Sequence, residues 1–400
     1  MSSTISLPPA PAAPVSDNAI LAISARAAEL CAQGTDVISL AAGEPDLPTP
    51  ANVTAAAARA AADPAYHRYG SAAGLPELRS LAADRLATAT GLPWNAEDIQ
   101  ITLGTKHALA LALQAVLGPD EDVLVTSPGW PGHHGAVQAA GGRVRSIPVR
   151  AEDRFLATPQ TLDLALTGRT RAVILASPGN PVGAVYPREL LADIADWALR
   201  HDVWIIADDI YDQFVYDGPH TTLLAAAPRA RDRCIVVNGV SKAHAMTGWR
   251  IGWLAGPASV VAHAFRNVSQ TITHVPLITQ AAAIEALAGD QRPLHEARTR
   301  YRANRDLLTD ALNTLPGIDC PRPSGGLYVF PSVAALLARH PERWTSAADV
   351  AAWLLDTAHV AAVPGEVFHA PNHLRLCFAV SDTAVREAIQ RLCRAFETLT

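Results

Sequence analysis

The run VSKAHAMTGWRIG, residues 240–252, places Lys242 and Arg250 in a stretch that is otherwise small and apolar. Of the 32 Lys and Arg residues in the chain, only Lys106 and Lys242 are lysines. An arginine side chain keeps its proton in a protein, whereas a lysine amine loses it when it is desolvated or placed beside other cations. The lysine at position 242 therefore indicates that the amine itself is needed for chemistry.

Other polar residues stand where apolar runs end. Asp208 and Tyr211 follow VWIIA, where a buried carboxylate is costly unless it meets a cation or a hydrogen-bond donor. Asn180 lies in the Gly/Pro-rich turn SPGNPVG, with its amide free to bind a ligand. In LGTKHALA, we expect Thr105 to be the N-cap of a helix whose exposed backbone N–H groups form an anion site.

Together these positions offer an anion cradle, a carboxylate, an amide, a phenol and a lone amine, with Arg250 as a fixed cation. An amine can condense with an aldehyde, and a helix N-terminus can hold a phosphate. The set therefore favours a phosphorylated heterocycle that bears an aldehyde as the ligand.

The elements that must position these residues begin at about residue 98, where short apolar runs alternate with amphipathic or Ala-rich segments. The apolar runs cover residues 98–104, 122–128, 171–178, 203–211, 234–242 and 250–256. Most are apolar on both faces, as parallel strands covered by helices on both sides are. In open α/β sheets, ligands bind at the carboxyl ends of the strands, which is where the polar residues stand.

Beyond about residue 288 the pattern changes to a charged helix, the short runs GGLYVF, VAAVPG and HLRLCFA, and a last amphipathic helix. This pattern predicts a smaller α+β domain. We expect residues 18–48 and 289–400 to form that domain and residues 49–288 to form the large one. The Ser/Pro/Ala-rich segment 1–17 is expected to be a flexible leader.

The bulk composition is that of a globular protein, with 49% hydrophobic and 18% charged residues among 400. A net charge of −6 argues against a nucleic-acid partner, and no apolar run approaches the roughly 18 residues that span a bilayer. Five scattered cysteines without a C-x-x-C pair indicate reduced thiols in the cytoplasm. His133 and His134 lack further ligands at zinc-like spacing, so we expect no metal site and a surface or pocket-rim place for the pair.

The run SKAHAMTGWRIG resembles the lysine signature of class I aminotransferases, fold-type I enzymes that depend on pyridoxal 5′-phosphate (PLP). The resemblance covers the chain from about residue 18, through six further motifs in the family's order. These are LAAGEPDLPTP (40–50), YGSAAGLPELR (69–79), SPGNPVGAVYP (177–187), DDIYD (208–212), PSGGLYVF (323–330) and VPGEVFHAPNHLRL (363–376). The resemblance implies an α/β fold with a mostly parallel seven-stranded sheet covered by helices, plus the smaller α+β domain.

The resemblance also implies roles for the residues around the cofactor ring. Lys242 would hold PLP as a Schiff base and then move a proton between the substrate and the cofactor. Asp208 would keep the pyridine nitrogen protonated, while Tyr211 and Asn180 would hydrogen-bond the ring oxygen. Trp130, in SPGWPG, would stack on the ring.

Further roles concern the phosphate and the substrate. The residues implied around the phosphate are Gly104, Thr105, Lys106, Ser241 and Arg250. Tyr69 would reach the phosphate of a neighbouring subunit, which implies a homodimer with shared active sites. Arg375 would bind the substrate α-carboxylate bidentately, with the backbone of Gly43 beside it and with Trp130 and Asn180 also near the substrate.

The resulting hypothesis is an aminotransferase that moves an amino group between an L-amino acid and a 2-oxo acid by a ping-pong reaction through pyridoxamine phosphate. A PLP-dependent lyase that eliminates a β-substituent is an alternative, because the same groups serve both reactions. A non-catalytic PLP-binding regulator is disfavoured, because regulators of this kind carry a fused DNA-binding domain and we count only 17 residues before Asn18. A serine hydrolase is disfavoured too, because GVSKA (239–243) departs from G-x-S-x-G at its last position.

The substrate is left open by two conflicting signals. Gly129 replaces a large aromatic residue of aspartate-specific relatives, and Asn18 and Ile20 replace hydroxyl residues, which predicts a roomier pocket. Lys106 points the other way, because it matches a lysine that relatives use for the distal carboxylate of acidic substrates.

Overall fold

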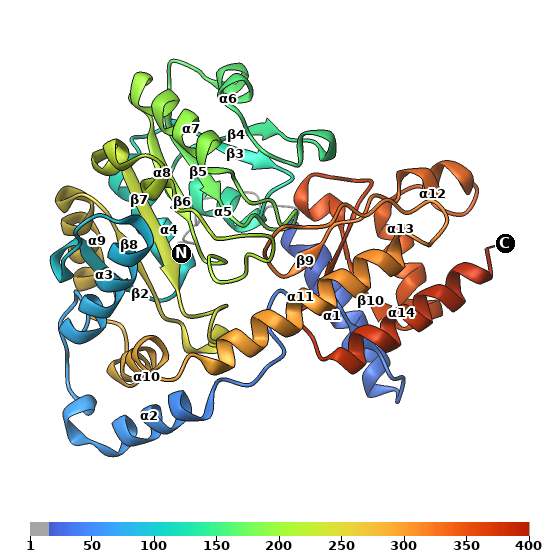
Figure 1. The fold of residues 1–400 in the computed structure, drawn as a ribbon, viewed down its shortest axis with the longest axis horizontal. Helices are drawn as coiled ribbons and strands as arrows, with labels where there is room; N and C mark the ends of the chain where they lie inside the picture. Colours follow the sequence, from blue (N-terminus) through green and yellow to red (C-terminus); the bar gives the residue numbers. More distant parts are fainter. Residues whose placement is uncertain (1–15, 400) are drawn as a thin grey trace, which may run out of the picture.

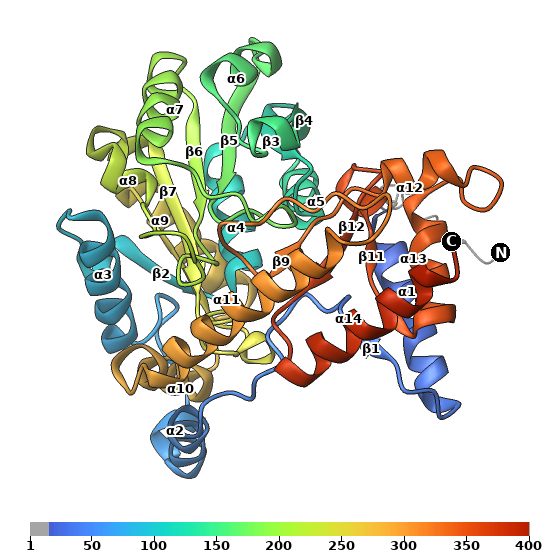
Figure 2. The same ribbon diagram turned by 45° about the vertical axis from the view of Figure 1, so that its right-hand side comes forward.

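The computed structural model describes residues 16–399. Figures 1 and 2 show a larger body built around a twisted sheet and a smaller body that contains the helices from both ends of the described chain. Helix α11 (Arg292–Leu312) is the longest element and runs from the larger body into the smaller one. The expected leader, 1–17, lies almost wholly outside the described residues, although helix α1 (Ser16–Ala32) already includes its last two positions.

The main sheet has seven strands in the order β2-β8-β7-β6-β5-β3-β4. Their bounds are β2 Ile99–Thr102, β3 Asp122–Ser127, β4 Arg143–Pro148, β5 Thr170–Ala176, β6 Trp204–Asp208, β7 Cys234–Gly239 and β8 Gly252–Ala255. Strand β8 runs antiparallel to both of its neighbours, and every other pairing is parallel. The predicted mostly parallel seven-stranded sheet is thus confirmed.

Both faces of this sheet are buried, which explains why its strands are apolar without alternation. Val173 packs into the core on one face and the next residue, Ile174, into the core on the other. Helices α4 (Thr105–Val116) and α9 (Ala258–Thr271) cover one face, and α3 (Pro76–Thr90) and α7 (Arg188–Arg200) cover the opposite one.

Strand β4 was not among the runs that the sequence analysis singled out. It lies at the edge of the sheet and pairs only with β3. Arg143 and Arg145 are exposed on it, while Ile147 is fully buried. An edge strand that faces solvent carries charged residues and lacks the continuous apolar run by which the inner strands were recognised.

The smaller body joins the two ends of the chain. Strand β1 (Ile38–Ser39) pairs in parallel with β10 (Val360–Ala361), and α1 contacts β10 and β11. Strands β11 (Val363–Pro364), β12 (Leu374–Cys377) and β9 (Tyr328–Val329) form an antiparallel sheet beside α13 (Ala347–Trp353) and α14 (Asp382–Glu397). These contacts agree with a small domain made of residues 18–48 and 289–400, whose limits remain a prediction.

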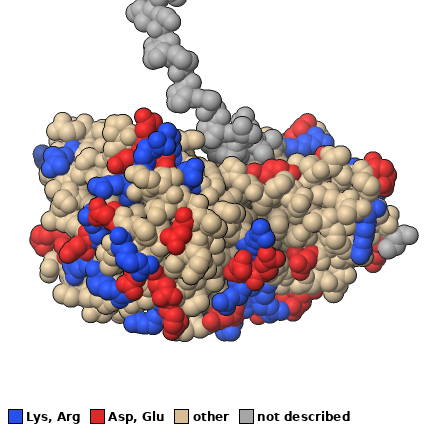
Figure 3. Space-filling view, turned by 90° about the horizontal axis from the view of Figure 1, so that it is seen from above, with Lys and Arg blue, Asp and Glu red and all other residues tan. Residues whose placement is uncertain are grey.

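The other helices are α2 (Ala51–Ala62), α5 (Pro131–Ala139), α6 (Pro159–Ala165), α8 (Leu223–Ala226), α10 (Leu277–Ala288) and α12 (Ala334–Arg339). Shorter helical turns are η1 Pro64–His67, η2 Ala96–Asp98, η3 Ala151–Asp153, η4 Pro228–Arg233, η5 Thr247–Trp249, η6 Leu354–Ala358 and η7 Gly365–Phe368. Within residues 16–399, no helix has both the length and the apolarity to cross a membrane. On the face seen in Figure 3, acidic and basic side chains intermingle, and no large basic patch stands out.

Candidate active site

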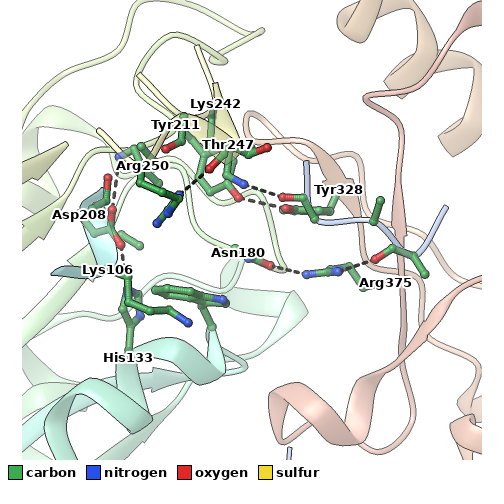
Figure 4. A pocket seen from close by; sticks show the side chains of 18 residues that line it. Lys106, His133, Asn180, Asp208, Tyr211, Lys242, Thr247, Arg250, Tyr328 and Arg375 are labelled. Atoms are coloured by element: carbon green, nitrogen blue, oxygen red, sulfur yellow. Dashed lines mark hydrogen bonds and ion pairs between the residues drawn. The ribbon is translucent and has the colours of Figure 1, made fainter. Parts of the chain in front are cut away.

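A cavity of about 360 Å³ lies where the carboxyl ends of the main strands meet the smaller body. Every predicted site residue lines this cavity except Gly104 and Tyr69. Those that line it are Gly43, Thr105, Lys106, Trp130, Asn180, Asp208, Tyr211, Ser241, Lys242, Arg250 and Arg375. Figure 4 shows their side chains converging from both bodies.

The amine of Lys242 stands in the turn that follows β7. Its Nζ donates a hydrogen bond of 2.6 Å to the carbonyl oxygen of Gly43. Burial lowers the pKa of Lys242 to about 8, and the cations Arg375 and Arg250 push it in the same direction. Around physiological pH a sizeable fraction of this lysine is therefore the neutral, nucleophilic amine, although the protonated form remains the major one.

The carboxylate of Asp208 ends strand β6 and is only 4% exposed. Its Oδ2 lies 2.9 Å from Nε2 of His133 on α5, and its Oδ1 accepts a hydrogen bond from the backbone N–H of Ile210 at 3.3 Å. His133 is itself 4% exposed, so its place is not on the surface. It forms part of the cavity wall and orients the carboxylate.

Tyr211 and Tyr328 meet through their hydroxyl groups, which lie 3.0 Å apart. Burial raises the pKa of Tyr211 well above its usual value, so its phenol stays protonated and can donate a hydrogen bond into the cavity. Tyr328 belongs to the motif PSGGLYVF (323–330) but was not among the predicted site residues. An aromatic residue in a short apolar strand carries no signal that separates a core position from a cavity position.

Arg375 on β12 is 4% exposed and is held by neutral groups. Its guanidinium donates to the carbonyl oxygen of Ala41 at 2.9 Å and to Oδ1 of Asn180 at 3.4 Å. Its Cζ lies 4.4 Å from the centre of the Tyr328 ring. Among the described residues no carboxylate pairs with Arg375, which leaves its charge available for an anionic ligand.

The start of helix α4 corrects one expectation. Gly104 is the N-cap and Thr105 is the first helical residue, so Thr105 is not the cap. The φ of Gly104 is +79°, and a Cβ there would lie 2.6 Å from the Arg250 guanidinium, so only glycine fits. The hydroxyl of Thr105 is consequently not used for capping. It is buried and finds no partner in residues 16–399, as a ligand-binding group would be.

A phosphate fits this corner of the cavity. The unpaired Thr105 hydroxyl, the first-turn N–H groups of α4 and the Arg250 guanidinium are all donors at one place. Arg250 itself is anchored by a 2.6 Å hydrogen bond to the carbonyl oxygen of Thr247. The donor set therefore suits the phosphorylated, aldehyde-bearing ligand predicted from the sequence.

Lys106 lies on the same side of the cavity as Trp130. Its Nζ is 5.2 Å from the centre of the Trp130 ring, and within the described chain it makes no ion pair. Gly129, in contrast, does not line this cavity. A Cβ at Gly129 would lie 2.2 Å from the carbonyl oxygen of Thr126, so this backbone has no room for a side chain there.

Two predicted features lie elsewhere. Tyr69 is 87% exposed, contacts His274 edge to face and lies outside the cavity. The side chains of Asn18 and Ile20 lie outside the part of the chain that the structure describes.

The family of class I and class II aminotransferases matches residues 35–392 of the chain. The chain belongs to this family. It is 37% identical to the aspartate aminotransferase of Streptomyces avermitilis over 381 residues, which cover 94% of this chain and 93% of that protein.

Two solved aminotransferase structures resemble the whole fold. The aspartate aminotransferase of Thermus thermophilus with maleate has a TM-score of 0.87 at 38% identity, covering 94% of this chain and 96% of that one. The aspartate aminotransferase of Rhizobium meliloti has a TM-score of 0.90 at 35% identity, covering 98% of this chain and 99% of that one. The protein is therefore a PLP-dependent aminotransferase that moves an amino group between an amino acid and a 2-oxo acid, which confirms the preferred hypothesis.

Proposed function

We propose that the 360 Å³ cavity is the active site and that Lys242 carries PLP covalently within it. The observation that carries this proposal is the charge of the cavity wall. Four cations line it, namely Lys106, Lys242, Arg250 and Arg375, against the single carboxylate Asp208, which already bonds His133. The buried charge of Arg375 needs a partner, and the excess of cations around the cavity favours ligands that bring several negative charges, as a phosphate and a substrate carboxylate do.

PLP, when bound, supplies an electron-withdrawing protonated ring that weakens the C–H bond at the substrate Cα. Lys242 acts as the base that removes this proton and returns it elsewhere, a task that its lowered pKa of about 8 suits. Asp208 keeps the proton on the ring nitrogen, and His133 fixes the orientation of that carboxylate. Tyr211 and Asn180 bind the ring oxygen.

The phosphate would be held by Thr105, Ser241 and Arg250 together with the backbone of Gly104 and Lys106. The unpaired hydroxyl of Thr105 supports this assignment. Trp130 would cover the ring from the side of α5, of which it is the N-cap residue.

For the substrate we propose an acidic amino acid, held at both ends. Arg375 would bind the α-carboxylate through two parallel hydrogen bonds, which a planar guanidinium can make, with Gly43 beside it. Lys106 would bind the side-chain carboxylate, because it is a cation that faces the cavity without an ion-pair partner in the described residues. The similarity to aspartate aminotransferases, one of them solved with the dicarboxylate maleate, supports this choice.

We further propose that the enzyme works as a homodimer in the cytoplasm. The 87% exposed Tyr69 cannot serve its own cavity, which supports the proposal that it reaches the phosphate in a neighbouring subunit. All five cysteines are free, which is compatible with a reducing compartment.

The test of the substrate proposal is a panel of amino acids added singly to the purified holoenzyme. The change in visible absorption of the bound cofactor reports amino transfer without a coupled assay. We expect aspartate and glutamate to give the fastest change at low concentration. A faster change with neutral or aromatic amino acids than with both acidic ones would contradict the proposed substrate class while leaving the aminotransferase reaction in place.

A further inference from the structure

Tyr328 is placed between the two halves of the active site. It is 1% exposed, lies on β9 and faces Cys377 across the antiparallel pairing with β12. Side chains two positions apart on a strand share a face, so Arg375 projects on the same side as Cys377. This register brings the guanidinium of Arg375 over the Tyr328 ring, with Cζ 4.4 Å from its centre.

The other end of Tyr328 reaches Tyr211. The two hydroxyl oxygens are 3.0 Å apart, and the rings meet edge to face. Within the described residues neither hydroxyl makes another hydrogen bond. The direction of donation between them therefore decides whether Tyr211 has a proton to donate to a ligand. If Tyr328 donates, the proton of Tyr211 is free to point at a ligand. If Tyr211 donates to Tyr328, its proton points at Tyr328 and is not available to a ligand in the cavity.

We propose that Tyr328 is a positioning residue: its hydroxyl donates to Tyr211 and turns the Tyr211 proton toward the cofactor ring oxygen, while its ring holds Arg375. The proposal rests on the proposed role of Tyr211. Tyr328 thereby links the group that binds the substrate carboxylate to the group that binds the cofactor ring.

The electrostatics favour this direction of donation. Burial raises the pKa of Tyr328 to about 12, but the Arg375 guanidinium opposes that rise. For Tyr211, burial raises the pKa well above its usual value and the contact with Tyr328 adds to the rise, while Arg375 opposes it here too. The Arg375 guanidinium lies over the Tyr328 ring, 4.4 Å from its centre, so its positive charge favours Tyr328 as the donor of the pair. Hydrogen bonds in a chain polarise one another, which makes the Tyr211 hydroxyl a stronger donor to its ligand.

A consequence for binding follows from the position of Arg375. A substrate carboxylate that pairs with Arg375 compensates the positive charge above the Tyr328 ring, which makes Tyr328 a weaker donor. Tyr211 then donates less strongly to the ring oxygen, which keeps more negative charge on that oxygen. That charge favours a proton on the nitrogen of Lys242, through which the cofactor would be attached. Carboxylate binding should therefore raise the pH midpoint at which the visible absorption of the holoenzyme changes.

The test compares Tyr328→Phe with Tyr328→Leu in the holoenzyme. Tyr328→Phe removes only the hydroxyl and should raise the absorption midpoint by roughly half a pH unit, with maleate affinity nearly unchanged because the ring stays under Arg375. The upward shift of the midpoint that maleate causes should also become smaller. Tyr328→Leu removes the ring as well and should weaken maleate binding by roughly three- to tenfold.

The matched control is Tyr216→Phe. Tyr216 is 2% exposed, donates its hydroxyl to the carbonyl oxygen of Gly326 at 2.8 Å and does not line the cavity. Its loss should change the thermal stability without moving the midpoint. An unchanged midpoint and an unchanged maleate-induced shift in Tyr328→Phe would overturn the inference, even if Tyr328→Leu failed to fold.

A second reference separates this inference from the proposal on which it rests. Tyr211→Phe should raise the midpoint more than Tyr328→Phe does, because it removes the donor itself. If Tyr211→Phe moves the midpoint and Tyr328→Phe does not, only the positioning role of Tyr328 is wrong. If neither variant moves it, the proposed role of Tyr211 is wrong.

Discussion

The amine of Lys242 lies 2.6 Å from the carbonyl oxygen of Gly43, although the two residues are 199 positions apart in the chain. Gly43 belongs to the segment that also supplies Ala41, whose carbonyl oxygen accepts from Arg375. Carbonyl oxygens of one short stretch of backbone thus accept hydrogen bonds from both Lys242, the proposed nucleophile, and Arg375, the residue proposed to bind the substrate carboxylate. Both cations are thereby held at the cavity by neutral acceptors that leave their charges uncompensated.

The first prediction concerns pH. The pKa of Lys242 is lowered from 10.5 to about 8, chiefly by burial, so the neutral amine becomes the major form above about pH 8. The rate at which apoprotein captures PLP should therefore rise with pH through a midpoint near 8, as rapid-mixing absorbance would show. A midpoint near the ordinary lysine value would mean that the amine is solvated in the apoprotein.

The second prediction compares Lys242 with Lys106, the other lysine of the chain. Lys242→Arg should bind PLP loosely and show no turnover, because a guanidinium stays protonated and neither condenses with an aldehyde nor accepts the proton. Borohydride reduction followed by peptide mapping should label residue 242 in the wild type and in Lys106→Arg. Label at Lys106 in the wild type would refute the assignment of the covalent site.

The third prediction concerns Asp208, with its neighbour Asp209 as the control. Asp208→Asn should preserve the fold but slow proton removal from the substrate by several powers of ten, each tenfold step being about 1.36 kcal/mol of barrier. Asp209 is also buried, but burial and the nearby carboxylates raise its pKa well above the usual value, and it does not line the cavity. Asp209→Asn should therefore keep most of the activity. Equal losses in the two variants would argue that Asp208 acts only through the fold.

The fourth prediction separates Arg375 from Lys106. Hydrogen bonds to charged groups contribute roughly 1.5–3 kcal/mol, so Arg375→Lys should lower kcat/KM by about ten- to a hundredfold for every amino acid. Lys106→Ala should impair glutamate and aspartate while sparing neutral amino acids. If Lys106→Ala weakened all substrates alike and released PLP, the lysine would belong to the phosphate site instead.

The fifth prediction tests the shared active site. Lys242→Ala and Tyr69→Ala should each be impaired as homodimers. In a mixed dimer, one cavity contains intact Lys242 and receives intact Tyr69 from the other subunit, so activity should return after subunits are exchanged. Light scattering should show a dimer in all cases. A mixture no more active than its components would exclude the proposed contribution of Tyr69.

Much of the site could be predicted from local patterns. An apolar run followed by a small or polar residue marks the carboxyl end of a buried strand, and this pattern places Asp208, Lys242 and Thr105 at one edge of the sheet, where all three line the cavity. The scarcity of lysine in the chain indicated that the amine of Lys242 has a chemical role. Both signals are local, because the burial of a strand is recorded in its own residues.

The contacts that organise the cavity depended on tertiary structure. His133 and Asp208 are 75 positions apart, Tyr211 and Tyr328 are 117 apart, and Asn180 and Arg375 are 195 apart. A histidine or a tyrosine in an apolar segment is equally compatible with the core and with a cavity wall, since burial selects the same residue types in both. Only the packing of the smaller body against the strand ends decides which of these side chains meet, because hydrogen bonds require separations near 3 Å that no pattern within one segment can specify.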